Sequence, residues 1–88
     1  MVSRKVTVNN KLGLHARPAG TLVNLAKKYK SEVKMTAGAK NVNVKSIMSL
    51  LSAAVQCGTE VEFICSGEDE NEALQDIVTS VEAGLGEE

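Results

Sequence analysis

The sequence has few of the residues on which most catalytic and nucleic-acid-binding sites depend. It contains one histidine, two cysteines and no tryptophan, and its large aromatic side chains are Tyr29 and Phe63. Cys57 and Cys65 do not have a metal-ligand spacing and one histidine cannot complete such a set, so we expect no metal and no cofactor. Two aromatic rings offer no platform on which bases could stack, which argues against a nucleic-acid-binding protein.

Long apolar segments are also lacking. No run approaches the roughly 20 apolar residues of a membrane span, and the first residues, Met1 to Val6, lack the apolar core of a signal peptide. We therefore expect a cytoplasmic protein with no membrane partner, in which both cysteines are free thiols. The 88 residues suit one domain, residues 1–88, which is too small for a deep enzyme cleft.

Acidic and basic residues occupy different parts of the chain, although the formal net charge is only −1. All 10 Lys and Arg residues lie at or before Lys45, whereas all but one of the 11 acidic residues lie at or after Glu60. The fold either interleaves the two halves or leaves a basic surface around His15 that meets an acidic partner or a phosphate. The sequence leaves both alternatives open.

Hydrophobic periodicity predicts the order β-α-β-β-α-β-α. Apolar and polar residues alternate in four segments, and apolar residues recur at helical spacing in three others. The predicted strands cover 2–8, 32–37, 41–44 and 60–65, and the predicted helices cover 16–28, 46–55 and 69–85. Because each strand has one apolar face, the helices must all cover the same side of the sheet, which defines a two-layer α/β (α+β) sandwich.

Small and polar residues mark the ends of these elements. Gly38-Ala39 separates the second and third strands and fits a type II′ turn. We expect Gly58 to end the second helix and Gly84 to let the third helix fray. Asp69, with Glu72 three residues later, has the spacing of a capping box at the start of the third helix.

The stretch Gly13-Leu14-His15-Ala16-Arg17-Pro18-Ala19 contains the single histidine and the single proline. Gly13 can adopt backbone angles closed to other residues, and Pro18 falls in the first helical turn, where a missing N–H costs little. The imidazole of His15 is therefore expected at a helix N-terminus, where N–H groups and the helix dipole favour an anion.

This position suits a phosphoryl group carried on the imidazole. A neutral imidazole is nucleophilic, and the added charge would be met by the backbone N–H groups of Ala16 and Arg17 and by the Arg17 guanidinium. The sequence has no second histidine, and we identify neither a Ser-His-Asp set nor a metal site in it. Transfer to and from partner proteins therefore fits better than turnover of a small molecule. The alternative is a surface histidine without a role.

Ser46 is the second candidate. Its hydroxyl is expected to cap the helix that follows, and this could be its whole role. Phosphorylation at a helix N-terminus next to Lys45 would preserve the fold and change the surface that partners meet. Ile47, Met48 and Leu51 lie on a short helix that cannot bury every side, so they form a candidate docking patch unless that helix is fully buried.

Gly13 to Ala19, together with Lys45-Ser46-Ile47-Met48, resembles HPr, the histidine-containing phosphocarrier of the bacterial sugar phosphotransferase system. The resemblance covers essentially the whole chain and implies an open-faced β-sandwich, with a four-stranded antiparallel sheet covered on one face by three helices. It implies that enzyme I, phosphorylated by phosphoenolpyruvate, donates a phosphoryl group to Nδ1 of His15. His15 would pass this group to the IIA domain of a sugar permease, with support from Arg17.

The serine is similar to that of Gram-positive HPr. The resemblance implies that an ATP-dependent HPr kinase/phosphorylase modifies Ser46. The modified protein would bind the catabolite control protein as a corepressor and be a poorer substrate for enzyme I. The resemblance also places Ile47, Met48 and Leu51 in a partner-docking patch, with Gly20 at its edge, where Thr or a larger residue is usual.

Three interpretations remain. The first is a monomeric, stoichiometric phosphoryl carrier that is not an enzyme. The second is a regulatory paralogue that works through Ser46 with His15 idle; the family's regulatory paralogues lack the active histidine, so its presence argues against this. The third is an accessory domain of a larger protein. Ser49 and Ala54 stand where Gram-positive members often have glycine, and Cys57 is unusual in the family.

Overall fold

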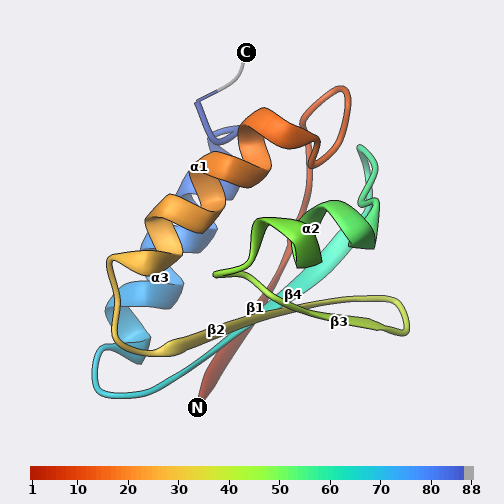
Figure 1. The fold of residues 1–88 in the computed structure, drawn as a ribbon. Helices are drawn as coiled ribbons and strands as arrows, with labels where there is room; N and C mark the ends of the chain where they lie inside the picture. The colour runs from red at the N-terminus through yellow and green to blue at the C-terminus, as the bar shows by residue number, and fades with distance from the viewer. Residues whose placement is uncertain (87–88) are drawn as a thin grey trace.

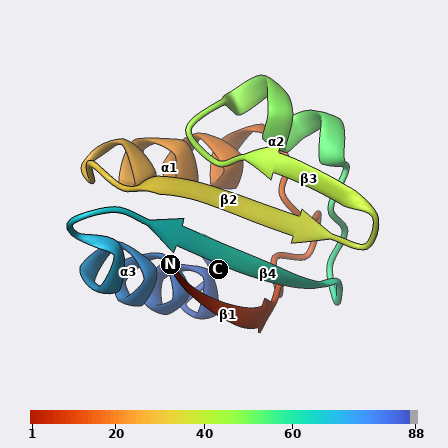
Figure 2. The ribbon, with the colours of Figure 1, turned by 90° about the horizontal axis from the view of Figure 1, so that it is seen from below.

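The computed structural model describes residues 1–86 and confirms the predicted order of elements. Over these residues the strands are β1 (Val2–Thr7), β2 (Glu32–Ala37), β3 (Lys40–Asn43) and β4 (Glu60–Ser66). The helices are α1 (Ala16–Lys27), α2 (Ile47–Ala53) and α3 (Glu70–Glu82). In Figure 1 the helices lie above the sheet, and Figure 2 looks onto the sheet face that they leave open. The predicted two-layer sandwich is therefore confirmed.

The sheet has the order β1-β4-β2-β3, and its neighbouring strands are antiparallel. The central strand β4 alternates as predicted: Val61, Phe63 and Cys65 are buried under the helices, whereas Glu60 is exposed on the open face. Strand residues point alternately to the two faces, so this pattern gives the sheet one apolar side.

The helices bury one stripe each against that apolar side. The stripe residues of the two long helices are Ala19, Leu22, Val23 and Ala26 of α1 and Leu74, Ile77, Val78 and Val81 of α3. Each fully buried Leu, Ile or Val contributes roughly 1.5–3 kcal/mol relative to an exposed position. This core holds α1 rigidly over the sheet and so fixes the place where α1 begins.

The β2–β3 hairpin has the predicted turn. Ala37 pairs with Lys40, which leaves Gly38-Ala39 as a two-residue loop. Within this loop Gly38 has a positive φ of 62° and Ala39 does not. A type II′ turn requires a positive φ at its first central position only, so the prediction is confirmed.

The predicted end of the second helix is wrong. α2 ends at Ala53, and Ala54 is its cap in the left-handed region, with φ 52° and ψ 44°. Gly58 lies in a later turn, where its N–H donates to the carbonyl of Val8 at 2.7 Å. Glycine is the usual residue at a left-handed cap, and here alanine takes that conformation despite its Cβ.

The predicted capping box at Asp69 is also wrong. Asp69 precedes α3, but its side chain makes no capping hydrogen bond. Its carboxylate instead accepts from the backbone N–H groups of Lys30 and Ser31, each at 2.9 Å, and from the Ser31 hydroxyl. The Ser31 hydroxyl and the Lys30 N–H lower the pKa of Asp69 to about 2. The Asp69 carboxylate, which the local spacing predicted to cap α3, therefore binds the loop after α1 instead.

The predicted third helix, 69–85, is too long at its C-terminal end, because α3 ends at Glu82. Gly84 and Gly86, where fraying was predicted, both lie beyond that end. After Glu82 the chain forms a tight turn, in which Leu85 N–H donates to the Ser80 carbonyl at 2.9 Å and Gly84 N–H to the Val81 carbonyl at 3.0 Å. Leu85 has a φ of 54° and is only 3% exposed. The turn after α3 is therefore fixed in the core. The acidic end of the chain, 87–88, lies outside the described residues.

Candidate functional site

His15 is the residue that precedes α1. Its backbone is extended, with φ −79° and ψ −171°, and its carbonyl accepts from Ala19 N–H at 3.0 Å, which starts the helical hydrogen bonds. Pro18 has no N–H, so the first turn presents the N–H groups of Ala16 and Arg17, which have no helical carbonyl to donate to. The imidazole is half-buried and both following residues are exposed. The predicted place of His15 at a helix N-terminus is confirmed.

Gly13 is required in the loop before His15 for two reasons. Its φ is +70°, and a Cβ at this position would lie 2.1 Å from the Val55 carbonyl oxygen and 2.8 Å from Gln56 Cα. The same Val55 carbonyl accepts from Leu14 N–H at 2.9 Å. The loop that carries His15 is thus packed directly on the segment that follows α2.

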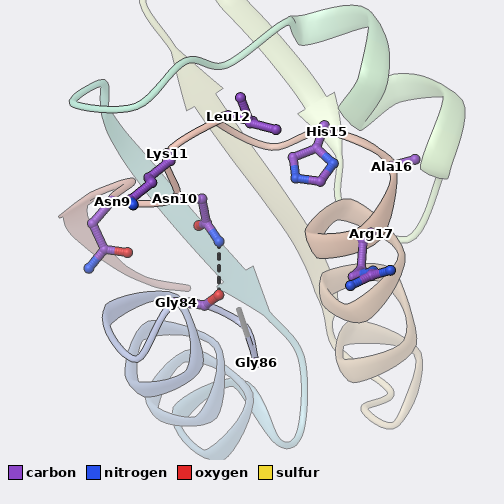
Figure 3. A pocket seen from close by; sticks show the side chains of 9 residues that line it. All are labelled: Asn9, Asn10, Lys11, Leu12, His15, Ala16, Arg17, Gly84 and Gly86. Atoms are coloured by element: carbon purple, nitrogen blue, oxygen red, sulfur yellow. Dashed lines mark hydrogen bonds between the residues drawn. The ribbon is translucent and has the colours of Figure 1, made fainter. Parts of the chain in front are cut away.

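An open pocket surrounds His15 (Figure 3). Its lining residues are Asn9, Asn10, Lys11, Leu12, His15, Ala16, Arg17, Gly84 and Gly86. The loop before α1, the first turn of α1 and the turn after α3 each contribute to it, and Arg17 reaches toward the same opening as the His15 ring. Within residues 1–86, the charged side chains of this lining are the cations of Lys11 and Arg17. The pocket therefore suits an anionic group.

The sequence left two alternatives for the charges, interleaved halves or a basic surface around His15, and each is found in one part of the molecule. On the open sheet face Lys5 of β1 stands opposite Glu62 of β4, so the two halves of the chain interleave there. At the His15 pocket Lys11 and Arg17 come from the basic half, and the basic character is retained. The region around His15 can therefore attract a phosphate or an acidic partner.

Ser46 caps α2 as predicted. Its Oγ accepts from Ser49 N–H at 3.3 Å, and the side chain is half-buried. Lys45 does not turn toward the serine hydroxyl in this arrangement: its Nζ donates to the Tyr29 carbonyl at 2.8 Å. Lys45 therefore ties the start of α2 to the end of α1.

The candidate docking patch is exposed. Met48 is 70% exposed, Leu51 40% and Ile47 37%, so the alternative of a fully buried helix is wrong for these side chains. Leu50 supplies the buried contact of α2 with the core. α2 packs against α1, so the patch lies beside the helix that begins after His15. Gly20 is on α1, and a Cβ there would meet no atom within 4 Å, which leaves room for the larger residue usual in the family.

Sequence reasoning missed the contact between the loop before His15 and the turn after α3. Asn10 Nδ2 donates to the Gly84 carbonyl at 2.8 Å, and Asn9 Nδ2 donates to the Glu82 carbonyl at 3.2 Å. These partners are more than 70 residues apart in the sequence, so no local pattern could have indicated them. Each partner carbonyl belongs to the end of α3, which sequence reasoning expected to fray.

Other kinds of site find no support in the described part of the chain. Among residues 1–86 no group of three or more His, Cys, Asp or Glu side chains could hold a metal ion. Both cysteines are free thiols, Cys57 exposed and Cys65 buried, as predicted. Burial, with the nearby carboxylates of Asp69 and Glu70, raises the pKa of the Cys65 thiol. None of the helices in this range is both long and apolar enough to cross a bilayer.

The chain is an open-faced α/β sandwich with a histidine at the start of its first helix and an arginine two residues later. Comparison with protein families agrees: the family described as "PTS HPr component phosphorylation site" matches residues 2–83. The chain therefore belongs to the HPr family, the phosphocarriers of the bacterial phosphotransferase system, as the sequence motifs predicted.

The individual relatives include proteins named HPr and the HPr-like protein Crh. The HPr-like protein Crh of Bacillus subtilis is 49% identical over 82 residues, which cover 93% of this chain and 96% of Crh. The crystal structure of HPr-C-His from Thermoanaerobacter tengcongensis superposes with a TM-score of 0.96 at 40% identity, covering 100% of this chain and 99% of that one.

A solved structure of Crh from Bacillus subtilis differs more. It is 46% identical with a TM-score of 0.77, covers 99% of this chain and 100% of that chain, and is described as a dimer with a swapping domain. That structure superposes on this chain less well than HPr-C-His does, although its sequence identity is higher.

Proposed function

We propose that this protein is a phosphoryl carrier that accepts a phosphoryl group on His15 from enzyme I and delivers it to the IIA domains of sugar permeases. The observation that carries the proposal is the position of His15. The imidazole precedes α1, whose first turn presents two N–H groups and the Arg17 side chain to a pocket that Lys11 also lines. This arrangement favours an anion on the ring.

In the transfer step, Nδ1 of neutral His15 attacks the phosphorus of phospho-enzyme I. A new N–P bond forms, and the bond between phosphorus and the carrying group of enzyme I breaks with its electron pair returning to that group. The proton on Nε2 of His15 is released as the freed group of enzyme I takes up a proton. The reverse chemistry at a IIA domain regenerates His15. The protein is therefore a stoichiometric carrier, and the turnover belongs to the system as a whole.

The stabilisation of the phosphorylated form has to be moderate. A helix N-terminus contributes about 0.3–1 kcal/mol to an exposed anion, and the exposed guanidinium of Arg17 adds a charge that water screens. We assign to Arg17 and to the N–H groups of Ala16 and Arg17 the support of the phosphoryl group during transfer. Such support orients the group without trapping it.

The exposed side chains of Ile47, Met48 and Leu51 are proposed as the docking patch for these partners, with Gly20 at its edge. Their exposure and the packing of α2 beside α1 support this assignment. A partner that covered this apolar patch would lie next to the first turn of α1, which brings its own reactive group within reach of His15.

Ser46 supports a second, regulatory function. The 49% identity to Crh favours this function, because Crh is described as the catabolite repression HPr of Bacillus subtilis. We propose that HPr kinase/phosphorylase modifies Ser46 and that the modified protein binds the catabolite control protein. The Ser46 hydroxyl is half-buried and caps α2, so the kinase must displace one weak hydrogen bond to reach it.

Two parallel reactions separate the carrier from a purely regulatory protein. The protein is incubated either with enzyme I and phosphoenolpyruvate or with HPr kinase and ATP, and intact mass is measured before and after mild acid. The carrier gains one acid-labile phosphoryl group in the first reaction, which His15→Ala abolishes and Ser46→Ala does not. A gain in the kinase reaction alone, removed by Ser46→Ala, would identify a regulatory module with an idle histidine.

We further propose that the protein acts as a cytoplasmic monomer. β1 pairs with β4 over six residues, and the Met1 amino group forms an ion pair with Glu70 at 3.0 Å. A monomer requires that β1 keep these partners within its own chain. Light scattering after size-exclusion chromatography tests this. A measured mass twice that of the chain would show a dimer, as described for Crh, and would contradict the proposal.

A further inference from the structure

Asn10 connects the loop that carries His15 to the opposite end of the chain. It is 4% exposed, and its Nδ2 donates to the Gly84 carbonyl at 2.8 Å (Figure 3). Its own carbonyl accepts from Gly13 N–H at 2.8 Å. One buried residue thus touches both the turn after α3 and the glycine that lies two residues before His15.

The turn after α3 is a firm support for this contact. Leu85 is buried, and its N–H donates to the Ser80 carbonyl, while Gly84 N–H donates to the Val81 carbonyl. The Gly84 carbonyl therefore has a fixed position relative to the core. At the other side of the loop, Leu14 N–H donates to the Val55 carbonyl at 2.9 Å.

We propose that Asn10 is a positioning residue for His15. By fixing the loop on the turn after α3, its side-chain amide determines where the imidazole stands relative to the N–H groups of Ala16 and Arg17. This inference rests on the proposed function of His15 as a phosphoryl acceptor. It assigns to Asn10 no contact with the phosphoryl group.

Asn9 provides a built-in comparison. It makes the same kind of hydrogen bond to the last residue of α3, with Nδ2 donating to the Glu82 carbonyl at 3.2 Å, but it is exposed. Water replaces a lost hydrogen bond at an exposed site, whereas a buried carbonyl that loses its donor remains unsatisfied and the loop must move. The Asn10 contact therefore holds the loop more firmly than the Asn9 contact.

The test measures phosphorylation of His15 with two donors. Phospho-enzyme I requires docking, whereas phosphoramidate is a small phosphoryl donor that does not. We expect Asn10→Ala to lower the maximal rate with enzyme I about tenfold or more, with KM nearly unchanged, because small displacements of a reacting group carry such penalties. The rate with phosphoramidate falls in parallel, and Asn9→Ala loses less with both donors.

Two further variants separate positioning from loss of stability. Val33→Ala removes part of a buried side chain on β2, remote from the pocket lining, and is expected to keep the wild-type rate at temperatures where it is folded. Asn10→Asp keeps the size of the side chain but presents a carboxylate, which cannot donate to the Gly84 carbonyl. It provides a second folded variant if Asn10→Ala unfolds.

Three results would overturn the inference. Folded Asn10 variants could react at the wild-type rate with both donors, Val33→Ala could lose as much rate as Asn10→Ala, or Asn9→Ala could equal Asn10→Ala. Failure of the proposed function gives a different result, since wild-type protein would then accept no phosphoryl group from phospho-enzyme I.

Discussion

Replacing Gly13 by alanine tests how the fold presents His15. The substitution places a Cβ where φ is +70°, which costs about 1–2 kcal/mol for a residue other than glycine. That Cβ would stand 2.1 Å from the Val55 carbonyl oxygen, so the loop must move away. The movement breaks the hydrogen bond from Leu14 N–H to Val55 and leaves buried polar groups unpaired, which costs about 1–3 kcal/mol more.

We therefore expect Gly13→Ala to lower the free energy of unfolding by about 3 kcal/mol or more, a large fraction of the stability of a small domain. Urea denaturation followed by circular dichroism measures the loss as a lower midpoint with an unchanged m value. His15 phosphorylation by enzyme I should also slow in the folded fraction, because the displaced loop carries the imidazole with it.

Gly38 supplies the matched control. It has a similar φ of +62°, but a Cβ there would meet no atom within 4 Å. Gly38→Ala should therefore show the backbone strain alone, about 1–2 kcal/mol, with normal phosphorylation. Equal losses of stability for Gly13→Ala and Gly38→Ala would refute the reasoning, because the contact with Val55 would then have no energetic effect.

Four further outcomes are expected. Ala54→Gly should raise the free energy of unfolding by about 1 kcal/mol in urea denaturation, because Ala54 caps α2 at a φ of 52°; a lower midpoint would contradict this. Arg17→Ala should slow phosphorylation by enzyme I by about tenfold at an unchanged melting temperature, since the side chain is exposed; a large thermal destabilisation with normal transfer would oppose it. Ser46→Asp should keep the fold, because Asp also caps helices, yet lower transfer from enzyme I; unchanged kinetics would exclude charge at this patch as a control of docking. The pKa of Asp69, about 2, lies below its ordinary 3.8, so its contribution to stability is complete above about pH 4 and is lost as the pH falls toward 2; Asp69→Asn should flatten that part of the unfolding free energy against pH, measured in urea between these values.

The predictable part of the structure is what local sequence determines. Alternation in 60–65 reflects a strand with one buried face, and the stripe of α3 reflects a helix with one buried side. The turn at Gly38-Ala39 and the cap at Ser46 depend on residues only two or three positions apart. The position of His15 at the start of α1 was predictable for the same reason, because the residues next to it determine where the helix begins.

The errors arise where distant segments compete for the same group. Asp69 has capping-box spacing, but residues 30 and 31 bring N–H donors that no local pattern reveals. The end of α3 looked free to fray because Gly84 is flexible in isolation, whereas Asn10 and the burial of Leu85 hold it. Ala54 takes a left-handed cap because the chain must turn back toward the His15 loop, which overrides its preference.

The most direct measurement of the central claim is relay of the phosphoryl group through His15. Enzyme I, phosphoenolpyruvate and a sugar-permease IIA domain from the same organism are mixed with either wild-type protein or His15→Ala, and the intact mass of the IIA domain is followed. The account predicts an added phosphoryl group on the IIA domain with wild-type protein and none with His15→Ala. Phosphorylation of the IIA domain to the same extent with His15→Ala, or none with wild-type protein and an active enzyme I, would contradict it.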